Sequence, residues 1–154
     1  MDKLDKTDKK ILRILQSRAR VTNAQLSKEI GLSPAPTLER VKKLEKKGYI
    51  EGYRAELNYQ SVGLDVITFI QVTLKNNKKE TIAKFVDHIN QVDEIVECFH
   101  LTGHSDVLLK VITDSISTYQ NLIIEKLTAF DEIDKMESMV VLSTLKKSNN
   151  YPIS

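Results

Sequence analysis

The spacing of hydrophobic residues changes part-way along the chain. Up to about residue 48, apolar side chains recur at the three- and four-residue intervals of amphipathic helices. After Gly48 they alternate at the two-residue period of strands, interrupted by helical spacing over residues 79–90 and again from Ser115. This change predicts a helical N-terminal part followed by a part that mixes strands and helices.

Three helices are predicted before residue 48. Asp5 is a favourable N-cap for the first helix, and Gly31 ends a short second one. The third helix begins within residues 33–36, with the serine as its cap, and ends at Gly48. The two prolines of that segment fit a first helical turn, because N–H groups there have no intrahelical partner to lose. Residues 49–57 then predict a short hairpin or an extended wing.

The second part has the element order of a ferredoxin-like βαββαβ fold. The predicted elements are strand 66–74, helix 79–90, strands 94–101 and 106–112, a helix capped by Ser115, and strand 133–142. Both faces of the first strand are apolar, with Ile67 and Phe69 on one face and Val72 on the other. Two helices cover only one face of such a sheet, so a second copy of the sheet is expected on the other. The pattern therefore predicts an obligate dimer.

The chain is accordingly predicted to be an α+β protein with two domains. Residues 1–57 have the helix lengths of a helix-turn-helix domain with a short wing, and residues 58–65 form a linker. Residues 66–145 form the ferredoxin-like domain. Residues 146–154 form a polar tail that is expected to be loosely held or to cross to a partner subunit.

Composition indicates a soluble protein without a membrane segment. Of the 154 residues, 41% are hydrophobic and 29% are charged, and no apolar stretch has the length of a membrane helix. The charged N-terminus lacks the apolar core of a secretory signal, and the single cysteine, Cys98, excludes an internal disulfide. These features predict a cytoplasmic protein.

Charge is divided unevenly between the two halves of the chain. Residues 1–63 carry 14 Lys and Arg against 8 Asp and Glu, a net charge of +6. Residues 64–154 carry 9 against 13, a net charge of −4. A polyanion such as nucleic acid is therefore expected to meet the first half only.

The third predicted helix is expected to enter the major groove of double-stranded DNA, as the second helix of a helix-turn-helix does. The residues of its N-terminal half would face base edges, namely Ser33, Pro34, Ala35, Thr37, Leu38 and Arg40. Arg40 can donate two hydrogen bonds to a guanine, and Thr37 can make polar or methyl contacts. Glu39 is expected to orient neighbouring basic side chains rather than to touch DNA.

Further residues are expected to contact phosphates, which supply affinity but no sequence information. They are Lys42, Lys43, Lys46 and Lys47 on the same helix, Arg54 on the wing and Asn23 at the start of the second helix. The alternative is that these lysines form an ordinary solvated helix face. The protein would then be a metabolite-binding oligomer whose helical domain contacts other proteins.

Three segments of the sequence resemble the Lrp/AsnC family of feast/famine regulators. They are residues 4–12 (LDKTDKKIL), residues 31–50 (GLSPAPTLERVKKLEKKGYI), and Gly52 with Tyr53. The resemblance covers nearly the whole chain. It implies a winged helix-turn-helix, a dimer built through the βαββαβ sheets, and an octamer of four such dimers. It also implies control of transcription by an amino acid or related small metabolite bound between subunits.

The resemblance further implies where such an effector binds. The loop between the second and third strands comprises Thr102, Gly103, His104, Ser105 and Asp106, and the other response positions are Ile116, Met139, Val140 and Val141. The glycine and Asp106 match the family pattern, whereas relatives often have an acid and an aromatic residue in place of His104 and Ser105. Chemically, a glycine lets backbone approach a ligand closely, and the aspartate can receive an α-ammonium group. The alternative is a plain hairpin turn that is capped by its acid.

No catalytic, metal or cofactor site is predicted. A nucleophile elbow at Ser105 needs a glycine two residues later, where Val107 stands. Cys98 and His100 alternate on one strand face but have no clustered third and fourth ligand for zinc. The five glycines are never grouped as in a phosphate loop or a dinucleotide fingerprint. The chain is therefore expected not to be an enzyme, and its small-molecule partner is expected to be the effector alone.

Overall fold

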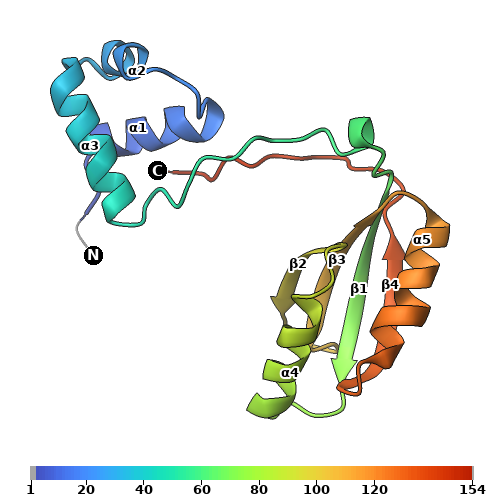
Figure 1. The fold of residues 1–154 in the computed structure, drawn as a ribbon. Helices are drawn as coiled ribbons and strands as arrows, with labels where there is room; N and C mark the ends of the chain where they lie inside the picture. The colour runs from blue at the N-terminus through green and yellow to red at the C-terminus, as the bar shows by residue number, and fades with distance from the viewer. Residues whose placement is uncertain (1–2, 154) are drawn as a thin grey trace. The chain divides into compact units, whose positions relative to one another are not determined.

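The computed structural model describes residues 3–153, which form two compact units (Figure 1). One unit contains the residues up to Glu56 together with the tail from Lys146, and the other spans Leu57–Leu145. The helix-turn-helix lies in the first unit and the ferredoxin-like sheet in the second, so the predicted fold class is confirmed. The tail, which the sequence predicted to be loosely held or to cross to a partner subunit, is grouped with the first unit in this chain.

Three helices build the N-terminal unit: α1 (Lys6–Ser17), α2 (Asn23–Ile30) and α3 (Pro34–Lys46). Asp5 and Asp8 form a capping box at the start of α1, in which each carboxylate accepts a hydrogen bond from the other residue's backbone N–H. Gly31 ends α2 in the left-handed conformation, with φ 76°, and so turns the chain into α3. Buried aliphatic residues of all three helices meet in the core of this unit: Ile11 and Leu15 from α1, Leu26 from α2 and Leu44 from α3.

The wing is extended. Residues 51–57, all of which are described, form no strand, so the hairpin alternative for this segment is wrong. The chain then enters the second unit, where a single 3-10 turn, η1 (Gln60–Val62), precedes the sheet.

The second unit is a four-stranded antiparallel sheet in the order β2-β3-β1-β4. Its elements are β1 (Val66–Leu74), α4 (Lys79–Ile89), β2 (Ile95–His100), β3 (Val107–Thr113), α5 (Ile116–Asn121) and β4 (Ile133–Val140). The turns η2 (Leu122–Lys126) and η3 (Leu127–Ala129) continue α5 toward β4. Ser115 caps α5, because its hydroxyl accepts from the Thr118 N–H at 3.1 Å. The predicted βαββαβ order is therefore confirmed.

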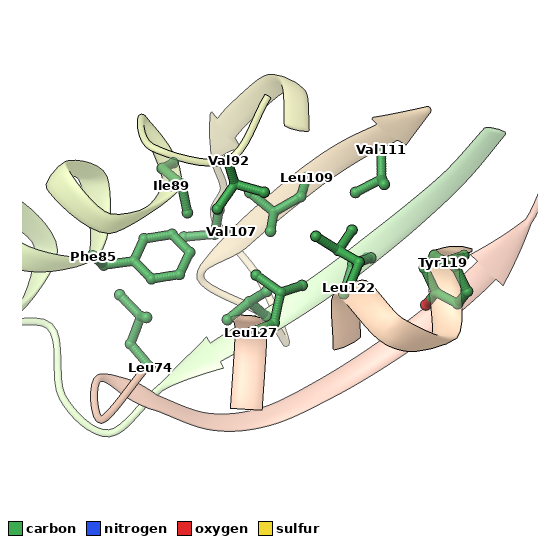
Figure 2. Close-up of a cluster of buried hydrophobic side chains, with 12 residues drawn as sticks. Leu74, Phe85, Ile89, Val92, Val107, Leu109, Val111, Tyr119, Leu122 and Leu127 are labelled. Carbon is green, nitrogen blue, oxygen red and sulfur yellow. The ribbon is translucent and has the colours of Figure 1, made fainter. Parts of the chain in front are cut away.

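Both helices cover the same face of the sheet. Alternate residues of β1, including Ile70 and Val72, are buried on this face. Phe85 from α4 and Leu122, which follows α5, belong to the same buried cluster (Figure 2). Alternate apolar side chains of the strands therefore pack against the helices, and the apolar side chains between them lie on the opposite face of the sheet.

The opposite face of the sheet carries exposed apolar side chains. Phe69 lies at its centre, paired with Lys110 on β3 and with Met139 on β4. Phe99 on β2 and Met139 are both more than two-fifths exposed within a single copy of the chain. This is the face for which the sequence predicted a second copy of the sheet.

Two buried threonines on the helix-covered face differ in their hydrogen bonds. Thr68 Oγ1 has no hydrogen-bond partner within the described part of the chain. Thr113 is similarly buried, but its hydroxyl donates to the Ser115 carbonyl at 3.0 Å. A buried hydroxyl without a partner destabilises the fold by about 1–3 kcal/mol.

We expect Thr68→Val to raise the free energy of unfolding by about 1 kcal/mol, because it removes the unpaired hydroxyl and keeps the branched shape. Thr113→Val is the matched control. It should lower the free energy of unfolding by about 1 kcal/mol, because it removes the hydrogen bond from the Thr113 hydroxyl and leaves the Ser115 carbonyl with the Tyr119 N–H alone. Urea unfolding followed by circular dichroism measures both variants. A loss of stability in Thr68→Val would contradict the assignment.

Candidate nucleic-acid interface and effector site

The start of α3 is held in place by α2. The side-chain amide of Asn23, the first residue of α2, donates to the Pro34 carbonyl at 2.8 Å. Asn23 therefore joins the first turns of the two helices, whereas the sequence predicted a phosphate contact for its side chain. This bond leaves Ser33, Pro34 and Ala35 as an exposed tip at the beginning of α3.

The two sides of α3 differ sharply. Thr37 and Leu44 are buried against the rest of the unit, and Val41 between them is half-buried. The residues that project to the other side are all exposed: Ala35, Leu38, Glu39, Lys42 and Lys46. A helix with 3.6 residues per turn separates exactly these two sets onto opposite sides. The outward side is the surface of α3 that a DNA groove can reach.

Thr37 is on the wrong side of α3 for a base contact. Its side chain is fully buried, and its hydroxyl donates to the Ser33 carbonyl at 2.9 Å. The same carbonyl receives the Thr37 backbone N–H at 3.3 Å, so Thr37 closes the first turn of α3. The geometry thus contradicts the predicted contact between Thr37 and DNA.

Arg40 is bound within the unit. One of its terminal nitrogens donates to Asp5 Oδ2 and to Asp8 Oδ1, both at 2.7 Å. These are the two carboxylates that cap α1, so Arg40 connects the middle of α3 to the beginning of α1. The predicted guanine contact would require Arg40 to leave both carboxylates, and this geometry argues against it.

The electrostatics of this cluster follow from its hydrogen bonds. The backbone N–H of Asp8 and then the guanidinium of Arg40 hold the pKa of the Asp5 carboxyl below its usual value. The two carboxylates raise the pKa of Arg40 in turn. Each charge therefore favours the ionised form of the other.

Lysines occupy the C-terminal half of α3 and its C-cap. Lys42, Lys43, Lys46 and Lys47 are all exposed. The Lys42 ammonium lies 3.8 Å from the Glu39 carboxylate, in a pair with both side chains more than half exposed. Exposed pairs of this kind contribute little, so Lys42 can exchange Glu39 for a phosphate at small cost.

The wing is attached to α3 by Tyr53. Its hydroxyl donates to Glu45 Oε1 at 2.9 Å. Burial, and secondarily the Glu45 carboxylate, raise the pKa of Tyr53 to about 12, so the hydroxyl keeps its proton and the bond persists at neutral pH. Arg54 is the next residue and is exposed, as its predicted phosphate contact requires.

The C-terminal tail is bound to α1. The Gln16 side-chain amide donates to the Tyr151 carbonyl at 3.0 Å, and its oxygen accepts from the Tyr151 N–H at 2.9 Å. Lys147 forms an ion pair with Glu56 at 2.8 Å, and this contact lowers the pKa of the Glu56 carboxyl. The first unit is therefore built from both ends of the chain.

The predicted effector loop is a hairpin whose acid is already engaged. Both carboxylate oxygens of Asp106 accept hydrogen bonds, one from the Leu74 N–H at 2.8 Å and one from the Asn77 amide at 2.9 Å. These bonds, that to Leu74 first, lower the pKa of Asp106. In this geometry the carboxylate attaches the loop to the end of β1 and the segment after it, and its two oxygens already have donors. Gly103 has φ 131°, a conformation that favours glycine over other residues at this turn.

The predicted effector residues form two clusters within one chain. The loop of residues 102–106 adjoins the pair Val72 and Val107, near the end of β1. Val140 pairs with Thr68, four residues earlier along β1, and Ile116 follows β3 at that same end of the sheet. At about 3.3 Å per residue, the two clusters are separated by about 13 Å along the strand. The fold of one chain does not bring them together.

The described residues contain neither a metal-binding cluster nor a membrane-spanning helix. Within residues 3–153, no three or more His, Cys, Asp or Glu side chains are grouped so as to hold a metal ion. None of the helices in this range is long and apolar enough to span a membrane.

Comparison with known proteins decides the family. Residues 4–51 match the profile of the winged helix-turn-helix DNA-binding domain, and residues 67–151 match the Lrp/AsnC ligand binding domain. The chain belongs to the Lrp/AsnC family. It is therefore a DNA-binding transcription regulator with a ligand-binding domain, as the sequence predicted.

Relatives of this Lrp/AsnC chain match along nearly their whole length. The leucine-responsive regulatory proteins of Klebsiella pneumoniae and of Escherichia coli strain K12 are each 36% identical over 150 residues, which cover 97% of this chain and 92% of theirs. A transcriptional regulator from Neisseria meningitidis, solved as its complex with L-Met, has a TM-score of 0.93 at 34% identity, with 97% of each chain covered. AsnC of E. coli has a TM-score of 0.89 at 32% identity, with 97% and 99% covered.

The sequence-based prediction for this Lrp/AsnC regulator missed that the side chains of Thr37 and Arg40 point toward the rest of the unit. The signal was present, because Thr37, Val41 and Leu44 share one helical phase that places Ala35 and Leu38 on the opposite side. No signal of this kind existed for the carboxylate partners of Arg40, which lie on another helix.

We expect Arg40→Ala to lower the free energy of unfolding by about 1 kcal/mol, since solvent screening weakens a half-exposed charge cluster. The lowered pKa of Asp5 means that its contribution is present at neutral pH and is lost as the pH falls below the ordinary value of 3.8. The stability difference from the parent chain should therefore shrink in acid.

The measurement is thermal unfolding of both chains between pH 7 and pH 2, with Lys43→Ala as an exposed control from the same helix. DNA binding by Arg40→Ala should weaken for all sequences alike. A change in base preference with unchanged stability would instead support the guanine contact.

Proposed function

We propose that two copies of this chain form a dimer that places their α3 helices in successive major grooves of a near-palindromic DNA site. The observation that carries the proposal is the exposed side of α3, with its tip at residues 33–35 and its lysines in the C-terminal half. The tip would meet base edges. The phosphate contacts would come from Lys42, Lys43, Lys46 and Lys47 of α3 and from Arg54 of the wing.

The open face of the sheet supports the dimer. Apolar side chains such as Phe99 and Met139 are exposed on it within one chain, and a second copy of the same face would bury them. We propose that four such dimers associate into an octamer, as the family resemblance implies. In this arrangement each dimer contributes two copies of α3.

The effector site would form between copies of the chain. The two clusters of predicted effector residues lie at opposite ends of one sheet, so one complete site needs the loop of one copy and the Ile116 cluster of another. The loop offers backbone N–H groups for a carboxylate. Ile116 and Val140 are exposed and apolar, which suits an uncharged amino-acid side chain. Met139 pairs with Phe69 on the open face, so it would contribute from the side that the second copy covers.

An amino acid or a related small metabolite is the proposed effector. The relative from Neisseria meningitidis was solved with L-Met bound, and its fold covers nearly all of this chain. Such an effector alters DNA binding only by its different affinity for two arrangements of the assembly. The protein would act in the cytoplasm, without a cofactor and without catalysing a reaction.

Salt tests the DNA proposal. Binding of the intact chain to duplex DNA should weaken steeply between 50 and 200 mM salt, because each phosphate contact releases a counterion. Lys42→Ala and Lys46→Ala should each reduce the slope of log affinity against log salt by about one per copy of the chain. Lys84→Ala, an exposed lysine of α4, is the matched control and should leave the slope unchanged. Absence of binding to duplex DNA even at 50 mM salt would favour the protein-contact alternative.

Mixed oligomers test the shared effector site. We expect Gly103→Ala, which strains the loop, and Ile116→Glu, which charges the apolar cluster, each to abolish the effect of the active amino acid on DNA binding. When the two variants are unfolded together and refolded as mixed assemblies, some sites pair an intact loop with an intact cluster. These mixtures should regain part of the response. If mixtures that are verified to contain both variants still show no effect of the amino acid on DNA binding, both clusters must come from one chain.

A further inference from the structure

The outward side of α3 contains a row of four residues at the spacing of one helix face. Ala35, Leu38, Glu39 and Lys42 follow the i, i+3, i+4, i+7 pattern, and we call this set the outward stripe. Leu38 is apolar, yet it lies on the outward side of the helix and is 42% exposed. The Glu39 side chain is 75% exposed. The stripe runs from the exposed tip of α3 to the first of its lysines.

With Thr37 and Arg40 held inward, α3 presents to base edges the outward stripe and, at its N-cap, the exposed hydroxyl of Ser33, which can bond to any base and so distinguishes them little. Thr37 is buried and Arg40 is bound to two carboxylates, so neither is available in this geometry. Pro34 lacks a backbone N–H, and Ala35 has only a methyl group. Leu38 and Glu39 are then the two side chains in the N-terminal half of the stripe that can distinguish bases.

The chemistry of the two residues is complementary. An apolar side chain in the major groove gains contact with the C5-methyl group of thymine. A carboxylate can accept a hydrogen bond from the N4 amine of cytosine, and it is repelled by the O6 and O4 acceptors of guanine and thymine. The surrounding phosphates also repel Glu39, so its placement is favourable only opposite a base that donates.

We propose that Leu38 and Glu39 determine the sequence preference of this regulator, Leu38 through a thymine methyl group and Glu39 through a cytosine amine. The inference rests on the proposed binding of α3 in a DNA groove and adds the bases that it selects. Glu39 thereby has a direct contact with DNA, beyond the orientation of Lys42 that the sequence predicted for it.

Selection from a random duplex library by the intact chain is the experiment. Glu39→Gln should replace the cytosine preference at one position of each half-site by an adenine preference, because a glutamine amide pairs with the N6 and N7 of adenine. Leu38→Ser should lose a thymine preference at a neighbouring position. Each change should alter relative affinity at that position by about fivefold or more, the lower end for a base contact.

Controls separate this inference from the proposed function. Lys42→Ala should weaken binding to all sequences and leave the base preferences unchanged. Thermal unfolding checks that Leu38→Ser and Glu39→Gln retain the fold, as their exposure predicts. Unchanged preferences in both variants, with salt-dependent binding intact, would overturn the inference alone. An intact chain that binds no duplex would overturn the proposed function and the inference together.

Discussion

Burial of Thr37 and Leu44 sets which side of α3 faces outward, and the guanidinium of Arg40, held between the carboxylates of Asp5 and Asp8, attaches the middle of α3 to the beginning of α1. The same carboxylates cap α1, where the partial positive charge of the helix N-terminus favours them. One cluster thus stabilises the beginning of α1 and attaches the middle of α3 to it. Because the cluster is half-exposed, it contributes only modestly to the free energy of folding. Its charge-assisted hydrogen bonds nevertheless require a specific orientation of the Arg40 side chain. Everything that α3 offers to DNA follows from the side of the helix that these contacts leave outward.

Much of the fold could be predicted from periodicity and caps. The change from helical to strand spacing located the βαββαβ elements, and Ser115 caps its helix as expected. The failures concern contacts between residues far apart in sequence. Arg40 and Asp5 are 35 positions apart, and Gln16 and Tyr151 are 135 positions apart, so no local pattern could indicate either pair. Thr37 is a different case, because its helical phase placed it inward and its polar type suggested the opposite.

The proposed effector site would draw on more than one copy of the chain. Antiparallel registry fixes the hairpin loop near Val72 and the Ile116 cluster near Thr68, at opposite ends of the sheet. The Asp106 carboxylate accepts from Leu74 and Asn77, so it attaches the loop to the end of β1 and the segment that follows it. A ligand site assembled from two such halves depends on association of copies. Sensing and assembly are then coupled by construction, because any molecule that binds across the junction favours the joined state.

The return of the tail to α1 makes the N-terminal unit discontinuous in sequence. The chain leaves this unit after Glu56 and rejoins it at Lys146, where Tyr151 bonds to Gln16. A fragment cut after Glu56 would therefore lose the partners of both Gln16 and Glu56. A DNA-binding fragment that keeps these contacts has to be spliced from the two ends, for example by grafting residues 146–154 through a flexible connector onto the first 56 residues.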